Sequence, residues 1–187
     1  MNVYDFDGTI YDGDSAVDFY FYCLRKRPQI AVYIFRQVLG VLRHAIGVID
    51  TKRMKEEFFS FLPALKNSEA FAALFWETRQ VKIKNWYLEQ REERDVVISA
   101  SPEFLLRPVC ANLGIRVPIA TRMSPDSGKI QGPNCKGAEK VLRFRECFPD
   151  GSIHRFYSDS LTDAPLAGLA EKAFLVRKDA LLPWPEQ

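Results

Sequence analysis

The sequence of 187 residues contains few of the residues that build metal–thiolate sites or disulfide frameworks. It has two histidines, which form no cluster, and no CxxC pair. The cysteines are widely spaced, at Cys23, Cys110, Cys135 and Cys147. This spacing predicts structural thiols in a reducing compartment and argues against a zinc site. The net charge of +2 likewise favours neither nucleic acid nor a strongly acidic partner.

The sequence also lacks a recognisable secretory signal and a convincing transmembrane segment. Its first residues already form an apolar run and an acidic motif, so we expect a cytoplasmic protein. Residues 30–49 are strongly apolar, but Arg36, Arg43 and His44 interrupt them, which makes a poor membrane span. Two interpretations of this predicted helix stay open. It packs within the fold or against a partner, or it makes peripheral contact with the inner face of the membrane or lines a lipid-accepting pocket.

The segment Asp5-Phe6-Asp7-Gly8-Thr9 is the most informative part of the chain. If residues 3–6 form a buried strand, its period of two places Asp5 and Asp7 on the same side of the chain. Gly8 then lets the backbone turn at the carboxyl end of the strand, where open α/β sheets bind ligands. Two carboxylates so close repel each other unless a cation shares them or one is protonated. The segment therefore predicts a site for a hard divalent metal.

This acidic segment has two other interpretations, a surface turn and a calcium-binding loop. Asp and Gly are common in surface turns, and DxDG also occurs in calcium-binding loops. A calcium loop that starts at Asp5 would need Glu at its last ligand position, which is occupied by Ala16. The calcium loop is thereby disfavoured, and the rest of the chain must distinguish a metal site from a turn.

The pattern along the chain predicts an α/β fold, a doubly wound parallel sheet with an inserted helical cap. Residues 15–92 show helical periodicity without convincing strands, and Ser68 is a plausible cap for one of their helices. Further strands are expected at 96–98, 115–121, 153–157 and 173–176, helices at 102–113, 135–148 and 164–170, and a hairpin turn at 126–129. We expect a core domain of residues 1–14 and 93–187 and a cap domain of residues 15–92.

Polar side chains recur at the ends of the other predicted strands. Ser99 follows one strand and suits an anion site, although it could simply cap the next helix. Lys136 is placed in the first turn of a predicted helix, where the helix dipole disfavours a cation, so it either faces an anionic ligand or is a solvated surface lysine. Asp159 and Asp163 form a second acidic pair, suited to an oxygen-ligand metal site or to a helix cap.

Together these pieces resemble the motifs of the haloacid dehalogenase superfamily of phosphatases in type, order and placement. Asp5 and Asp7 resemble its first motif, Ser99 the second, Lys136 the third, and Asp159 with Asp163 the fourth. The segments SASPEFL, NCKGAEKV and SDSLTDAPL and the helical insertion are similar to the phosphoserine-phosphatase-like branch, subfamily IB. Within it the pattern is most similar to phosphatidylglycerophosphate-phosphatase-like and histidinol-phosphatase-like members.

The resemblance implies a Mg²⁺-dependent phosphomonoester hydrolase with an aspartyl-phosphate intermediate. Asp5 would be the nucleophile, and Asp7 would act first as acid and then as base. The side chains of Asp5 and Asp159 and the backbone carbonyl of Asp7 would hold Mg²⁺. Ser99 and Lys136 would neutralise the phosphoryl oxygens.

Two further residues would support the metal ligands from behind, namely Asp163 and Thr9. Within the superfamily, the acid at the Asp7 position is typical of phosphatases and phosphomutases rather than ATPases or dehalogenases. An alternative of another class is an inert phosphate-binding protein, which the intact motif set disfavours.

The sequence indicates the substrate less clearly than it indicates the reaction. Asp14 stands where phosphoserine phosphatases carry a Glu that reads the substrate's amino group, and it could equally cap a helix. Lys52, Arg53 and Lys55 form a basic cluster that could bind a distal anionic group or be solvated. Because residues 30–49 are so apolar, we expect a lipid-linked or amphiphilic phosphate. The alternative is a small soluble metabolite such as phosphoserine or histidinol phosphate.

Overall fold

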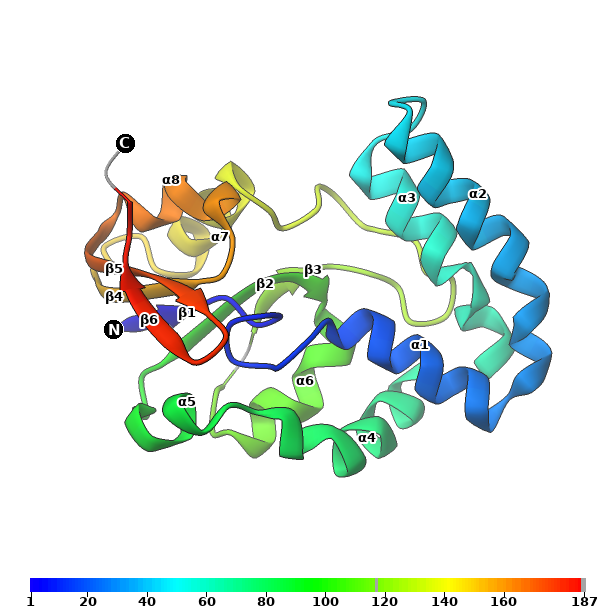
Figure 1. Ribbon diagram of the computed structural model, residues 1–187, viewed down its shortest axis with the longest axis horizontal. Coiled ribbons are helices and arrows are strands. Elements are labelled where there is room, and N and C mark those ends of the chain that lie inside the picture. Colours follow the sequence, from blue (N-terminus) through cyan, green and yellow to red (C-terminus); the bar gives the residue numbers. More distant parts are fainter. Residues whose placement is uncertain (117, 186–187) are drawn as a thin grey trace.

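The computed structural model describes residues 1–116 and 118–185 (Figure 1). Its six-stranded sheet has the order β3-β2-β1-β4-β5-β6, and all neighbouring strands are parallel except β5 and β6. The strands are β1 (Asn2–Tyr4), β2 (Val96–Pro102), β3 (Ile119–Thr121), β4 (Ile153–Ser158), β5 (Ala170–Arg177) and β6 (Ala180–Pro183). This arrangement confirms the predicted α/β class.

The sheet is covered on both faces, because the buried residues of its strands alternate between two apolar clusters. In β1, Val3 belongs to one cluster and Tyr4 to the other. In β4, Phe156 and Tyr157 divide in the same way. Strands buried on both sides read as continuous apolar runs, which is why the short segments could be recognised in the sequence.

Helices on the two faces complete the core (Figure 1). One face is covered by α7 (Ala138–Cys147) and α8 (Ala164–Ala167), which contribute Phe144 and Leu166 to their cluster. The other face is covered by α4 (Ser68–Arg79), α5 (Asn85–Gln90) and α6 (Glu103–Asn112).

The helices of the predicted cap segment, residues 15–92, fall into two groups. The first consists of α1 (Ser15–Lys26), α2 (Ile34–Ala45) and α3 (Thr51–Phe58), which form the lobe on the right of Figure 1. The second consists of α4 and α5, which pack against the core. Trp76 of α4 donates a hydrogen bond of 2.6 Å to the Leu105 carbonyl, and Tyr87 of α5 lies edge-on to Tyr4 at 5.0 Å between ring centroids. Short 3₁₀ segments join these helices, at Pro28–Tyr33, Phe59–Leu65 and Gln80–Lys82.

Several predicted details differ from the structure. Asn67, rather than Ser68, caps α4, because its side chain accepts the Ala70 N–H at 3.0 Å. Strand β6 is not among the strands that the sequence predicts. The predicted hairpin turn is confirmed by the Met123–Ile130 bridge. Of the strand predicted at 115–121, residue 117 lies outside the described residues.

Candidate active site

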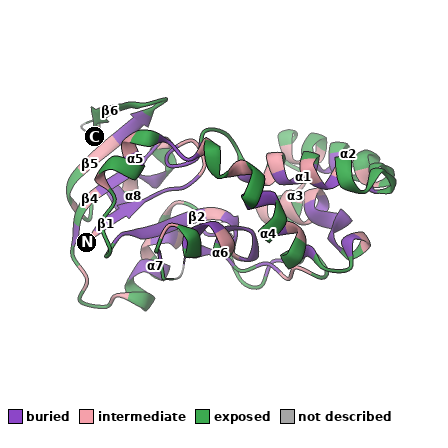
Figure 2. Ribbon diagram, turned by 90° about the horizontal axis from the view of Figure 1, so that it is seen from below, coloured by how far each residue is buried: buried purple, intermediate pink, exposed green. Residues whose placement is uncertain are grey.

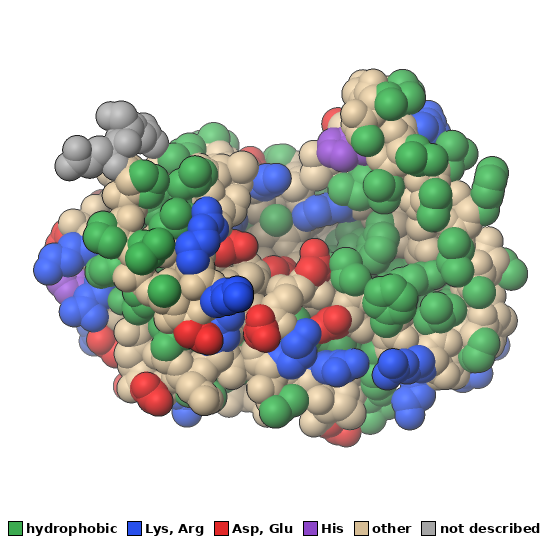
Figure 3. All heavy atoms as spheres, in the orientation of Figure 1, with side chains coloured by type: hydrophobic (Ala, Val, Ile, Leu, Met, Phe, Trp, Pro, Cys, Tyr) green, Lys and Arg blue, Asp and Glu red, His purple; other side chains and the backbone are tan. Residues whose placement is uncertain are grey.

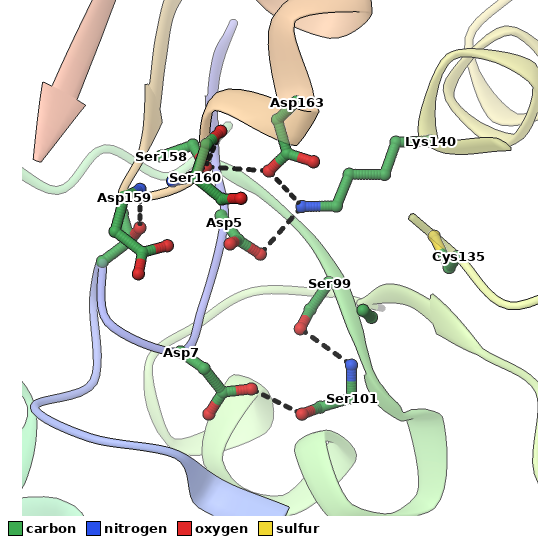
Figure 4. Close-up of polar contacts among 12 residues, drawn as sticks. Asp5, Asp7, Ser99, Ser101, Cys135, Lys140, Ser158, Asp159, Ser160 and Asp163 are labelled. Carbon is green, nitrogen blue, oxygen red and sulfur yellow. Dashed lines mark hydrogen bonds and ion pairs between the residues drawn. The ribbon is translucent and has the colours of Figure 1, made fainter. Parts of the chain in front are cut away.

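The carboxylate of Asp5 lies at the centre of the site, immediately after β1 (Figure 4). Its backbone N–H donates to the Tyr157 carbonyl at 2.8 Å, so the ladder between β1 and β4 holds the residue in place. One side-chain oxygen, Oδ1, accepts a hydrogen bond of 2.9 Å from Lys140 Nζ. The same ammonium donates to Asp163 Oδ2 at 2.7 Å. Lys140 therefore bridges the first and fourth acidic motifs.

The lysine that reaches the carboxylates is Lys140. The sequence predicts Lys136 in this place, and that prediction is wrong. The prediction relied on a helix from residue 135, but α7 begins at Ala138 after Gly137, which adopts a positive φ of 58°. Lys136 thus precedes the helix and is exposed. Lys140 lies one turn into α7 on the buried face that also carries Phe144. The signal in the sequence that could have identified it is the spacing of Lys140 from Phe144, which puts the lysine on the same helix face as a large apolar side chain, although Arg143 also lies on that buried face.

Charge is concentrated in this buried cluster. Burial raises the pKa of Asp5 to about 6, Lys140 opposes that rise, and Asp163 adds to it. Burial alone would lower the pKa of Lys140, but Asp5 and Asp163 raise it. Lys140 is therefore held as a cation between two acids, with its side chain only 2% exposed.

Asp7 is held by two hydrogen-bond donors from different elements. Its Oδ1 accepts the Ser15 N–H at 2.7 Å at the start of α1, and its Oδ2 accepts the Ser101 hydroxyl. Burial raises the pKa of Asp7, and the charge of Asp14 raises it further, while both serine contacts lower it. A carboxyl group with a raised pKa, fixed beside a second carboxylate, is suited to exchange protons with a bound molecule.

Ser99 is buried within β2 and does not cap the following helix, since α6 is capped at Pro102. Its hydroxyl accepts the Ser101 N–H at 3.1 Å. The register of β2 against β3 shifts between Ser99 and Pro102, so the ladder is irregular here. Ser101 is not among the predicted site residues, although its spacing of two from Ser99 places the two hydroxyls on one side of a strand.

The described residues offer a ligand set that fits a hard cation. Asp159 follows β4, the strand paired with β1, and its N–H is held at 2.9 Å by the Thr9 hydroxyl. A Cβ on Gly8 would lie 2.2 Å from Asp159 Oδ2, so only glycine lets the two acidic loops approach this closely. Burial raises the pKa of Asp159, as it does that of Asp5, and the charge of Asp163 adds to both rises. A nearby divalent cation would favour the ionised form of these acids.

The donor set contains few side chains. No group of three His, Cys, Asp or Glu side chains suited to a metal occurs within residues 1–116 and 118–185. The predicted set relies on two carboxylates and a backbone carbonyl, with water completing the shell, as is usual for Mg²⁺. Asp163 lies behind it, and its Oδ2 also accepts the Ser158 hydroxyl at 2.8 Å.

Asp5, Asp7 and Asp159 follow the carboxyl ends of the paired strands β1 and β4, while Ser99 comes from β2 and Lys140 from α7. A comparison of the whole chain with known families agrees with this arrangement. The profile of the haloacid dehalogenase-like hydrolase family matches residues 3–168. The chain belongs to this family.

Similar proteins support the assignment to the haloacid dehalogenase-like hydrolases. Protein CicA of Caulobacter vibrioides is 28% identical over 190 residues, covering 90% of this chain and 82% of that protein. The "Probable phosphatase Rv3661" of Mycobacterium tuberculosis is 35% identical over 91 residues, covering 45% of this chain and 32% of that protein.

Two solved structures share the fold. A Bordetella pertussis protein of unknown function superposes with a TM-score of 0.76 at 19% identity, covering 94% of this chain and 88% of that one. A phosphoserine phosphohydrolase-like protein of Francisella tularensis gives 0.59 at 18% identity, covering 96% and 88%.

Helix α3 brings a lysine of this hydrolase to the site from the lobe of α1, α2 and α3. Lys55 Nζ donates to the Ala100 carbonyl at 2.7 Å and to Asn134 Oδ1 at 2.8 Å. Burial lowers its pKa to about 8, against the opposing effects of Asp7 and Asp14. Lys55 belongs to the basic cluster that the sequence offered for a distal anionic group, whereas Arg53 of the same cluster pairs with Glu57 at 2.9 Å along the helix surface.

Asp14 caps α1, because its Oδ1 accepts the Val17 N–H at 3.0 Å. This confirms the structural interpretation of the residue. Its charge also acts on Asp7 and on Lys55, so it lies near the mouth of the site.

Proposed function

We propose that this hydrolase is a Mg²⁺-dependent phosphomonoester phosphatase that works through an aspartyl-phosphate on Asp5. The observation that carries the proposal is the environment of the two acids. Asp5 is oriented by the buried ammonium of Lys140. Asp7 has a raised pKa although one hydroxyl and one backbone N–H donate to its carboxylate. One acid is thereby suited to attack and the other to transfer protons.

In the first half-reaction, an Asp5 oxygen attacks phosphorus, and the bond from phosphorus to the ester oxygen breaks. Asp7 gives its proton to the departing alkoxide, so the alcohol leaves neutral. In the second half-reaction, Asp7 takes a proton from water as that water attacks phosphorus, which releases phosphate and restores Asp5. Dividing one displacement into two steps is the general advantage of a covalent intermediate.

The charge on the phosphoryl oxygens must be offset throughout. Lys140 replaces Lys136 in this role, because its ammonium already contacts the attacking carboxylate. Ser99 lies between Asp5 and Ser101 in Figure 4 and would donate its hydroxyl to a phosphoryl oxygen. When bound by Asp5, Asp159 and the Asp7 carbonyl, with Asp163 and Thr9 behind them, Mg²⁺ would supply further positive charge.

For the substrate, an amphiphilic or lipid-linked phosphate is the better candidate. A groove between α1 and α2 has an almost wholly apolar lining. Its residues are Val17, Tyr20, Phe21, Leu24, Ile34, Gln37, Val38, Val41, Leu42 and Phe58. The groove shares helix α1 with the site, because α1 carries Val17 of its lining and begins at Ser15, whose N–H contacts Asp7. A lipid-linked substrate also agrees with the resemblance of the sequence motifs to phosphatidylglycerophosphate-phosphatase-like members of the phosphoserine-phosphatase-like branch.

Small metabolites such as phosphoserine or histidinol phosphate are the second candidate. The opposite charges of Lys55 and Asp14 near the mouth of the site favour them, because such a pair suits a small zwitterion.

The nucleophile is tested by Asp5→Asn, assayed with Mg²⁺ and an aryl phosphate. We expect turnover to fall by about a thousandfold or more, since an amide cannot form the intermediate. The matched control is Asp12→Asn, an exposed acid of the same loop, which should keep its activity. Activity retained in Asp5→Asn would refute the nucleophile, and wild-type protein without any turnover would favour an inert phosphate-binding protein.

The substrate class is tested with a panel of lysophosphatidate, phosphatidylglycerophosphate, phosphoserine, histidinol phosphate and sugar phosphates. We expect the highest kcat/KM for an acyl-bearing phosphate. A preference for phosphoserine or histidinol phosphate would reject the amphiphilic class while leaving the chemistry of Asp5 intact.

A further inference from the structure

Helix α2 is packed with its polar side inward. Its only buried residues are Gln37 and Gly40. Gln37 donates to the Phe58 carbonyl at 2.8 Å, and Arg36 forms an ion pair with Glu57 of α3. A Cβ on Gly40 would lie 2.7 Å from the Glu57 Cβ, so glycine permits this close polar packing. An amphipathic helix of a globular protein normally turns its apolar face to the core, and α2 does the reverse.

The outward side of α2 and its flanks is correspondingly apolar. Phe35 is 79% exposed, and Val32 and Ile46 on either side of it are 77% and 75% exposed. The other exposed apolar residues of the helix and its flanks are Ile34, Val38, Leu39, Val41, Leu42 and Val48. Figure 2 shows α2 largely exposed at the end of the molecule, and Figure 3 shows hydrophobic side chains across this lobe. A contiguous patch of this kind indicates a surface that is covered in use.

Charge distinguishes between the possible covers. Residues 19–49 contain no Asp or Glu, and their basic residues are Arg25, Lys26, Arg27, Arg36 and Arg43. Arg25, Lys26 and Arg27 at the end of α1 are exposed. Two copies of this surface would bring like charges together, whereas an anionic surface would attract them. Arg36 is balanced by Glu57, so the exposed Arg25, Lys26 and Arg27 carry this argument. Apolar side chains on a lobe with exposed basic residues are the combination that binds the headgroup region of an anionic bilayer.

We infer that the outward face of α2, with the exposed end of α1, docks onto an anionic lipid bilayer surface. The contact is interfacial, since within residues 1–116 and 118–185 no helix is both long and apolar enough to cross a bilayer. The apolar groove between α1 and α2 belongs to the same surface, since Ile34, Val38, Val41 and Leu42 of α2 line it.

The experiment is sedimentation of the full chain with vesicles of phosphatidylcholine, with and without phosphatidylglycerol. We expect binding to the mixed vesicles that weakens with salt, and little binding to phosphatidylcholine alone. Phe35→Glu should weaken binding about tenfold or more, because an exposed aromatic that would enter the bilayer is replaced by a charge that the anionic lipid repels. The matched control is Val81→Glu, which adds the same charge at an 86% exposed residue outside the patch and should bind as the wild type does.

Both substitutions are at exposed positions, so circular dichroism and hydrolysis of a soluble aryl phosphate should be unchanged. Absence of vesicle binding by the wild type, or equal losses in Phe35→Glu and Val81→Glu, would overturn the inference. A dimer that Phe35→Glu dissociates, without vesicle binding, would overturn it in favour of a second copy. Vesicle binding without phosphatase activity would refute the proposed function and leave the docking surface standing.

Discussion

At the scale of single residues, the site depends on which lysine meets which acid. Lys140 donates to both Asp5 and Asp163, and its side chain is buried. Removing one member of a buried ionic cluster leaves the other charges uncompensated. Lys136, four residues earlier, is exposed and precedes the helix.

These environments predict different outcomes for the two lysines. Lys140→Met should lower the free energy of unfolding by about 3 kcal/mol and abolish turnover, because Asp5 and Asp163 then repel each other without a cation. Lys136→Met should change the stability by less than about 0.5 kcal/mol. Denaturant unfolding and aryl phosphate turnover check both. Loss of activity confined to Lys136→Met would restore the original assignment.

At the scale of elements, α3 connects its lobe to the catalytic loops. Lys55 reaches the Ala100 carbonyl within the irregular part of β2 and the Asn134 side chain in the loop before α7. Glu56, the next residue, accepts the Ile130 N–H at 3.1 Å from the same loop. One turn of α3 thus contacts both strand β2 and the loop before α7.

The lowered pKa of Lys55 predicts a pH dependence of substrate binding. Its pKa is about 8, so the ammonium predominates below that pH and is lost above it. KM for a phosphomonoester should rise about tenfold as the pH passes from neutral to well above this value, since a charge-assisted hydrogen bond disappears. Lys55→Gln should show a raised KM at neutral pH and no further rise.

The matched control for this pH dependence is Lys52→Gln, on the same helix but without these contacts. It should keep the wild-type dependence of KM on pH. A pH profile of Lys55→Gln that follows the wild type would show that another group causes the rise.

At the scale of the whole molecule, the loops that follow β1 and β4 bring the acids Asp5, Asp7 and Asp159 into one site. A bound cation would offset their negative charge. A ligand that binds only the folded state stabilises it, by about 2.7 kcal/mol at a hundred times its Kd. Mg²⁺ should therefore raise the thermal midpoint by roughly 5 °C or more at saturation. Asp159→Asn should lose most of this rise, measured by calorimetry with and without chelator.

The control for metal binding is Asp150→Asn, an exposed acid away from these loops. It should respond to Mg²⁺ as the wild type does. An equal rise in Asp159→Asn would place the metal elsewhere.

The sequence by itself determined most strands of the sheet, the order of the acidic motifs and the family, because these depend on local patterns. Val3 to Asp7 combine an apolar strand with two acids within five positions, and the polar residues after the other predicted strands were enough to distinguish this motif from a turn. Short strands buried on both faces also stand out as apolar runs, whereas β6, a short and largely exposed edge strand, did not.

Only the tertiary structure decided which distant residues meet. Lys140, Ser101 and Lys55 join the site because a helix begins three residues later than expected, a strand shifts its register, and α3 contacts both β2 and the loop before α7. The sequence predicted an apolar helix at residues 30–49, but which side of it faces outward depends on its packing against Glu57 and Phe58. Patterns along a chain record local preference, while contacts between elements depend on how the whole chain packs.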